Sequence, residues 1–130
     1  MAEIYHLNEN NTYKLTFNLV NENDDAITLS VLDTFQLTLY YYNSSLGNSD
    51  RYHLATINSR YNQNIKNANN VTVSSQGAVT WVIQPEDNIK LNSDLEEELH
   101  VATFSWTYDS STKKNNKEIF LYVKDIPYAL

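Results

Sequence analysis

The chain has 130 residues, of which 42% are hydrophobic, and its formal net charge is −7. This length fits a single domain over residues 1–130, and the hydrophobic content is too high for a disordered chain. The acidic charge argues against nucleic acid and against a membrane surface as partners, since both select for clustered Lys and Arg. There is no cysteine, so disulfides and thiolate metal sites are excluded.

The first quarter of the chain predicts two strands joined by a turn. Residues 1–11 are mostly polar and are expected to form a short edge strand or an arm, with no signal peptide, so we expect synthesis in a cytoplasm. Apolar and polar side chains alternate over 13–19, the pattern of a half-buried strand. Residues 21–25 are Asn, Asp and Glu; Asn and Asp tolerate the left-handed backbone of a turn. Residues 26–32 predict the second strand, followed by a weak break at 33–34.

The middle of the chain alternates strands with polar connections. Residues 35–42 predict a strand whose odd positions face the core, which leaves Tyr40 and Tyr42 on the outward face. Residues 52–57 predict another strand, and 58–70 have neither a helical nor a strand period. Two further strands are predicted, at 71–73 and at 78–83 before Pro85.

The last third contains the strongest hairpin. Residues 98–108 alternate between a large aromatic face and a smaller one, and 118–124 return beside them. The connection at 109–116 is expected to be a turn with solvated lysines at its tip. Ser93 is placed to cap one helical turn over 93–97.

Short strands between polar turns, with no helix long enough to cover a sheet, predict an all-β fold. We expect a single antiparallel β-sandwich with long polar loops. The residues expected to form the framework of its core are Phe17, Leu37, Trp81, Phe104 and Trp106.

No pattern of side chains predicts catalysis or a bound cofactor. The acidic pairs at 86–87 and 96–98 could serve a glycoside hydrolase, but adjacent acids in a polar loop are usually solvated. Oxygen ligands for Ca²⁺ at 21–25 lack the spacing of a calcium loop, so a turn is favoured. The three histidines form no ligand pair, and His100 is expected to be structural. We therefore expect no catalytic residues, no metal and no cofactor.

The outward aromatic residues are the best candidates for a binding surface. They are Tyr40, Tyr42, Phe120 and Tyr122. Exposed aromatic patches mark protein interfaces or platforms that stack on sugars. The alternative is that this face packs against the other sheet or against the 58–70 segment, and the residue pattern leaves both open.

Three segments resemble a family of small bacteriophage virion proteins with an immunoglobulin-like sandwich. They are Ala55 to Arg60, Gly77 to Asn88, with its Gly-led strand ending in Pro-Glu-Asp, and His100 to Tyr108; Glu118 to Ile126 also fits. The layout is similar to the N-terminal domain of phage baseplate upper proteins. The likeness covers residues 54–126, and its motifs concern the framework of the fold.

The resemblance implies a non-enzymatic structural component of a tailed-phage virion, an immunoglobulin-like subunit of the capsid, neck, tail or baseplate. Such a subunit works by protein–protein contact with other virion proteins and in many copies or as a homo-oligomer. The absence of a coiled-coil or receptor-binding extension favours a capsid decoration protein or an accessory subunit of the tail or neck. A carbohydrate-binding or receptor-binding module that uses the surface aromatics is the alternative.

Overall fold

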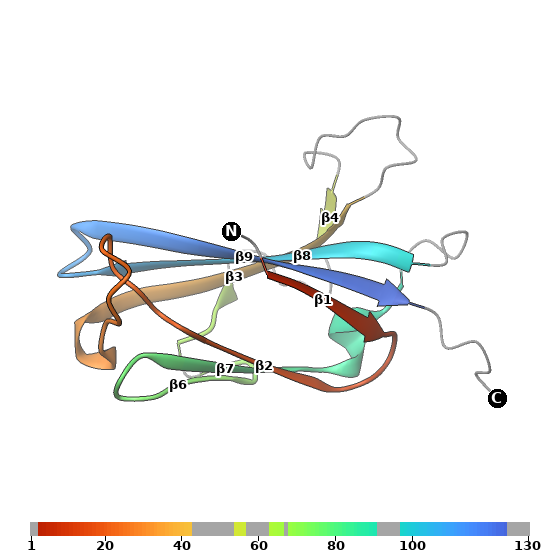
Figure 1. The fold of residues 1–130 in the computed structure, drawn as a ribbon, viewed down its shortest axis with the longest axis horizontal. Helices are drawn as coiled ribbons and strands as arrows, with labels where there is room; N and C mark the ends of the chain where they lie inside the picture. The colour runs from red at the N-terminus through yellow and green to blue at the C-terminus, as the bar shows by residue number, and fades with distance from the viewer. Residues whose placement is uncertain (1–2, 43–53, 57–62, 67, 91–96, 125–130) are drawn as a thin grey trace.

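Two β-sheets pack face to face in the computed structural model, which describes residues 3–42, 54–56, 63–66, 68–90 and 97–124, without the side chains of 42 and 54–56 (Figure 1). This architecture confirms the predicted all-β sandwich. The large sheet has the order β1 (Glu3–Asn8), β9 (Lys113–Lys124), β8 (Glu97–Tyr108), β3 (Leu32–Tyr42) and β4 (Leu54–Thr56), with β5 (Gln63–Asn64) also paired to β3. The small sheet has the order β2 (Tyr13–Asn18), β7 (Ala78–Ile83) and β6 (Val71–Val73).

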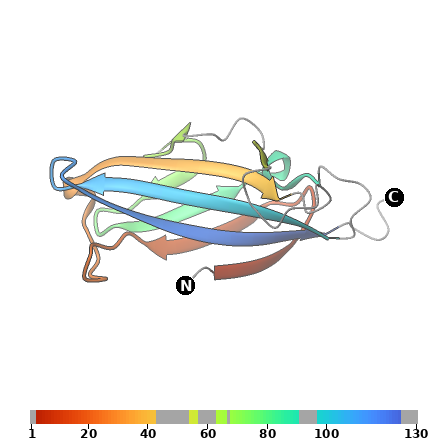
Figure 2. The ribbon, with the colours of Figure 1, turned by 90° about the horizontal axis from the view of Figure 1, so that it is seen from above.

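The N-terminal residues form an edge strand of the large sheet. β1 pairs with β9 in parallel, from Glu3 opposite Ile119 to Asn8 opposite Lys124. Seen from above, β3, β8 and β9 run side by side, with β1 beside β9 (Figure 2). The sequence predicted an antiparallel sandwich, and this parallel pair is an exception to that prediction. Parallel pairing is open to these strands because almost the whole chain lies between them, so no tight hairpin fixes their direction.

The predicted strand at 26–32 is wrong. Ala26 makes one isolated bridge with Val20, and Leu29–Val31 (η1) is a short 3₁₀ turn. The buried Ile27 and Leu32 anchor a crossing from the small sheet to the large one, whereas Ala26 and Val31 are exposed. Ile27 is buried, and its N–H donates to the carbonyl of Leu19. The expected break at 33–34 is an irregularity in pairing, since the register of β3 against β8 shifts between Leu32 and Thr34.

The predicted hairpin is present and longer than expected. β8 and β9 pair without interruption from Glu97 opposite Lys124 to Tyr108 opposite Lys113. The turn is confined to 109–112, because Asp109, Ser110 and Ser111 all adopt positive φ and reverse the chain at once. Residues 113–116, expected in the turn, belong to β9.

The core is aromatic and joins the two sheets. The Phe17 ring of β2 lies 4.9 Å from the Phe104 ring of β8, and Trp81 of β7 lies edge-on to Phe104 at 5.4 Å. Phe35 of β3 and Trp106 of β8 complete the cluster. The predicted framework residues Phe17, Leu37, Trp81, Phe104 and Trp106 are all buried. Their burial follows the alternation of side chains along each strand.

The polar connections contain more structure than the sequence indicated. Within 58–70, β5 pairs with β3 and Ile65 is fully buried. The helical turn lies at Pro85–Asn88 (η3), where Gln84 and Asp87 form a capping box. Of the turn expected at 93–97, Glu97 begins β8 and residues 93–96 lie outside the described residues. Of the strand expected at 52–57, residues 52–53 and 57 also lie outside them.

None of the described helices is long and apolar enough to cross a membrane.

Candidate functional site

The outer face of the large sheet carries two rows of apolar side chains. One row crosses four strands, because Val101 pairs with both Tyr40 and Phe120, and Phe120 pairs with Ile4. The next row crosses three strands, from Leu99 through Tyr122 to His6. We call these residues the outer-face patch: Ile4, His6, Tyr40, Leu99, Val101, Phe120 and Tyr122. Val101 is only 3% exposed, so the accessible surface of the patch comes from the other members.

The structure brings together the aromatic candidates whose side chains it describes. Tyr40, Phe120 and Tyr122 are all half-buried on this one face. Tyr42 ends β3 just beyond Tyr40, and its side chain lies outside the described residues. Partial exposure leaves the three rings available for contact, so they do not serve the core between the sheets.

The β1 side chains complete the patch. Ile4 is 56% exposed, the largest value among the exposed apolar residues of the described chain. The His6 ring stacks on Tyr122 with centroids 5.3 Å apart, and its Nδ1 lies 3.3 Å from a carboxylate oxygen of Glu97. Both groups of this pair are well exposed, so it contributes little to stability and fixes the imidazole at the rim of the patch.

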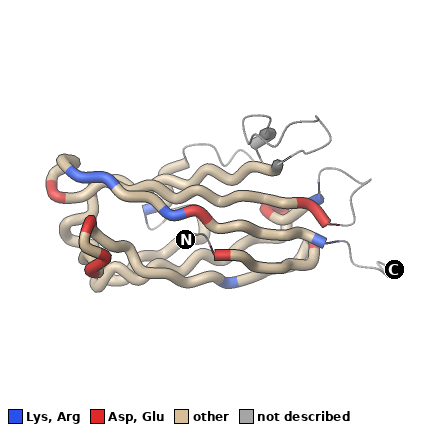
Figure 3. Tube along the Cα trace, turned by 45° about the horizontal axis from the view of Figure 1, so that its top comes forward, with Lys and Arg blue, Asp and Glu red and all other residues tan. Residues whose placement is uncertain are grey.

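The patch contains no carboxylate, lysine or arginine, although the protein has a net charge of −7. Many charged residues lie at the turns and strand ends, and Lys117 and Glu118 lie in the middle of β9 (Figure 3). The middle of β3 and β8 is uncharged. Glu118 borders one side of the patch, and Glu97 and Lys124 border the other. An uncharged, partly aromatic centre with a charged rim is the composition of a protein interface.

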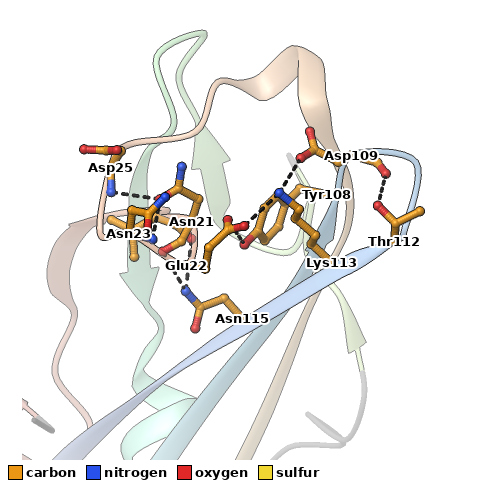
Figure 4. Close-up of polar contacts among 10 residues, drawn as sticks. Asn21, Glu22, Asn23, Asp25, Tyr108, Asp109, Thr112, Lys113 and Asn115 are labelled. Atoms are coloured by element: carbon orange, nitrogen blue, oxygen red, sulfur yellow. Dashed lines mark hydrogen bonds and ion pairs between the residues drawn. The ribbon is translucent and has the colours of Figure 1, made fainter.

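A polar network closes one end of the sandwich (Figure 4). Lys113 Nζ lies 2.7 Å from Glu22, and the Tyr108 hydroxyl donates to the other oxygen of the same carboxylate. Lys113 lowers the pKa of Glu22 mainly by its hydrogen bond. Burial and the bond to Glu22 raise the pKa of Tyr108. Lys113 is therefore an ion-paired residue of β9, and its predicted place in the turn is wrong. Its side chain is 46% exposed, so it is solvated as predicted.

Beside this network, the Asn115 side chain links β9 to the segment that follows β2. Its Nδ2 donates to the carbonyls of Val20 and Asn21, and its Oδ1 accepts the N–H of Asn116. Next to it lies an open groove of about 390 Å³, lined by Asn18, Val20, Asp24, Trp106 and 115–118. The amide of Asn115 is engaged on both sides, and the other polar groups of the groove come from Asn18, Asp24 and 116–118.

The described acidic candidates are dispersed, and of these only Glu97 lies at the rim of the outer-face patch, beside His6. Asp87 and Glu98 are fully buried, and Glu86 is exposed. The Asp87 carboxylate accepts the N–H of Gln84, and that of Glu98 lies 2.5 Å from His100 Nε2. Glu96 lies outside the described residues.

The Glu98–His100 pair lies on the inner face of the large sheet, the face of β8 that also carries Phe104 and Trp106. Both side chains have no exposure, and His100 Nδ1 has no hydrogen-bond partner among the described residues. The sequence predicted a structural histidine at this position, partly buried; the burial is complete. His53, the third histidine, lies outside the described residues.

The 21–25 segment is a turn. The side-chain oxygen of Asn21 accepts the N–H groups of Asn23 and Asp25, and Asp24 has a φ of 62°. This oxygen is engaged by the backbone, as in an Asx turn. The described part of the chain contains no group of three or more His, Cys, Asp or Glu placed to hold a metal ion.

The sequence alone did not indicate Ile4, His6, Leu99 and Val101 as members of the surface. Leu99 and Val101 were on the correct face of the predicted strand, and their apolar character was the available signal. Ile4 and His6 reach the patch only through the parallel pairing of β1 with β9.

Comparison of the chain with known protein families and with curated proteins found no match. Function is therefore inferred from the surface itself and from the resemblance of its framework segments.

Proposed function

We propose that this protein is a non-enzymatic structural subunit of a tailed-phage virion that binds neighbouring virion proteins through the outer-face patch. The observation that carries the contact is the pair of uncharged rows across β3, β8, β9 and β1. In an acidic protein, such a face lowers the cost of bringing another surface close, because no charge there must lose its water.

Support for the virion comes from the framework resemblance of 55–60, 77–88 and 100–108 to phage baseplate proteins. The sandwich holds the last two of these segments as β7 with η3 and as most of β8. β8 is a central strand of the sheet that carries the patch, and β7 is the middle strand of the sheet packed against it. Residues 57–60 of the first segment lie outside the described residues.

The test is the substitution Phe120→Glu, which places a carboxylate in the centre of the patch. We expect binding to proteins from disrupted virions to weaken at least about tenfold, as for a central interface residue. Thr16→Glu is the matched control, because Thr16 is exposed on β2 of the other sheet and receives the same charge. Circular dichroism checks that both variants fold.

Two results would contradict the proposal. One is the absence of the protein from purified virions by mass spectrometry. The other is equal binding by Phe120→Glu, Thr16→Glu and the unmodified chain, which would remove the patch from the contact.

A carbohydrate-binding module is the second candidate. The favouring observation is that Tyr40, Phe120 and Tyr122 keep part of their rings exposed on one sheet face, where a sugar ring could stack. Binding on a glycan array that Phe120→Glu abolishes would assign this function. A silent array together with Phe120-dependent binding to virion proteins would exclude it.

A further inference from the structure

β1 leaves one edge of the large sheet open. Successive peptide groups of a strand point to opposite sides, and two hydrogen bonds fix their direction here. The Glu9 N–H donates to the carbonyl of Lys124, toward β9, whereas the Asn8 N–H donates to the Tyr13 hydroxyl, away from β9. Counting back in steps of two, the N–H and C=O groups of Ile4 and His6 also point away from β9.

This edge lacks the features that normally prevent strands from pairing. β1 contains no Lys, Arg or Pro, and its pairing with β9 has no register shift. Its one carboxylate, Glu3, accepts a hydrogen bond from Tyr5 and lies 3.0 Å from Lys117 Nζ. The charge at the edge is therefore already balanced.

The other described edges are better protected. β4 and β6 have only three residues each and β5 has two, and β2 carries the exposed Lys14. The first half of β9 faces the 20–26 turn, to which Asn115 bonds directly. β1 is thus the edge at which a second sheet meets the least resistance.

We infer that β1 pairs antiparallel with β1 of a second copy of this chain, about a two-fold axis perpendicular to the sheet. A two-fold axis in this direction keeps the outer face of each copy on the same side, and core-facing side chains beside core-facing ones. The partner is a second copy because the same strand offers matched donors and acceptors, and no free charge, on both sides of the axis.

One register satisfies the open peptide groups. Ile4 lies opposite the partner's His6, and His6 opposite the partner's Ile4, so each pair exchanges two backbone hydrogen bonds. Tyr5 then lies opposite the partner's Tyr5 at the axis. The next register would place Asn8 opposite the partner's Ile4, but the Asn8 N–H is already bound to Tyr13.

The pairing joins the two outer-face patches into one continuous surface, since Ile4 and His6 lie at their shared border. It goes beyond the proposed function, because the edge of β1 is a different surface. The edge would pair whether or not the outer face binds another protein.

A cysteine at the axis tests both the pairing and its register. Directly opposed residues that do not share hydrogen bonds have Cα atoms about 4.5 Å apart, within reach of a disulfide. The chain has no cysteine of its own, so Tyr5→Cys should form a disulfide-linked dimer under mild oxidation. Ile4→Cys is the matched control: it lies opposite the partner's His6 and should remain largely unlinked.

The uncrosslinked protein supplies the second measurement. Light scattering should give twice the 15.0 kDa mass of one chain. His6→Pro should reduce it to the monomer mass with an unchanged circular dichroism spectrum, because the lost N–H does not bond β9. His6→Ala, which loses the same side chain but keeps the N–H, should remain a dimer.

A monomer mass for the unmodified chain would overturn the inference. So would equal crosslinking of Tyr5→Cys and Ile4→Cys, or a dimer that His6→Pro leaves intact. Phe120→Glu should leave the dimer mass unchanged, so failure of this pairing and failure of outer-face binding are separate results.

Discussion

Replacing Gly77 with alanine should destabilise the protein by about 3 kcal/mol. Gly77 ends the turn that leads into β7 and has a φ of 82°, where a residue with a Cβ is strained by about 1–2 kcal/mol. A Cβ built there would also overlap the carbonyl oxygen of Ile27. Relief of the overlap requires the backbone of Ile27 or of Gly77 to move.

That movement would disturb hydrogen bonds that link the crossing segment to the small sheet. The Leu19 N–H donates to the Gly77 carbonyl at 2.9 Å, and the Ile27 N–H donates to the Leu19 carbonyl at 3.0 Å. Each such bond contributes about 1 kcal/mol, so losing one or both and adding the backbone strain gives about 3 kcal/mol. For a domain of this size, that corresponds to a fall in Tm of roughly 10 °C.

The assay is equilibrium unfolding in urea, followed by tryptophan fluorescence. Gln76→Ala, an exposed substitution in the same turn, is the control and should stay within about 0.5 kcal/mol of the unmodified chain. Gly77→Asn separates the two causes, because asparagine tolerates positive φ but keeps the Cβ. If Gly77→Asn were as stable as the unmodified protein, the steric reasoning would be refuted; an unchanged Gly77→Ala would refute both parts.

The other two predictions concern the core and the edge strand. In urea unfolding, Trp106→Phe should lower the free energy of unfolding by about 1 kcal/mol more than Trp81→Phe does. The reason is that Trp106 Nε1 donates to a carbonyl, whereas the buried Trp81 Nε1 has no partner among the described residues. Equal losses would contradict this. The hydrogen bond from Tyr5, aided by Lys117, holds the pKa of Glu3 below its ordinary value of 4.5. The stabilisation is therefore present above pH 4.5 and lost as the pH falls through the lowered pKa. Tyr5→Phe should flatten the acid side of the stability profile, by less than about 1 kcal/mol because Glu3 is partly exposed; an unchanged profile would count against the pair.

Local alternation predicted the strands well wherever one face is buried. Trp81 of β7 was expected in the core, and it is fully buried together with Val79 and Ile83, which share its face of the strand. In the 26–32 segment the same reasoning failed, because its buried apolar residues anchor a crossing between sheets. Apolar content alone does not distinguish a strand from such an anchor. The difference is whether the backbone of the segment pairs with a neighbouring strand.

The candidate surface was predicted in part. The outward positions of Tyr40, Phe120 and Tyr122 follow from the period of two along β3 and β9, so the sequence located them. It did not indicate Ile4 and His6, because nothing local specifies which distant strand β1 will join. The role of these residues as an interface stays a prediction.

The sequence by itself determined the all-β class, the inward faces of the main strands and the long hairpin of β8 and β9. Each of these depends on near neighbours: the alternation of side chains and a turn that reverses the chain. Tertiary structure decided the parallel pairing of β1, the assembly of the outer-face patch from four strands and the burial of Glu98 with His100. These depend on contacts between distant segments, 61 residues apart for Tyr40 and Val101 and 116 for Ile4 and Phe120, or on the packing of whole sheets. The energy of such contacts is shared across the fold, so no single segment of the sequence specifies it.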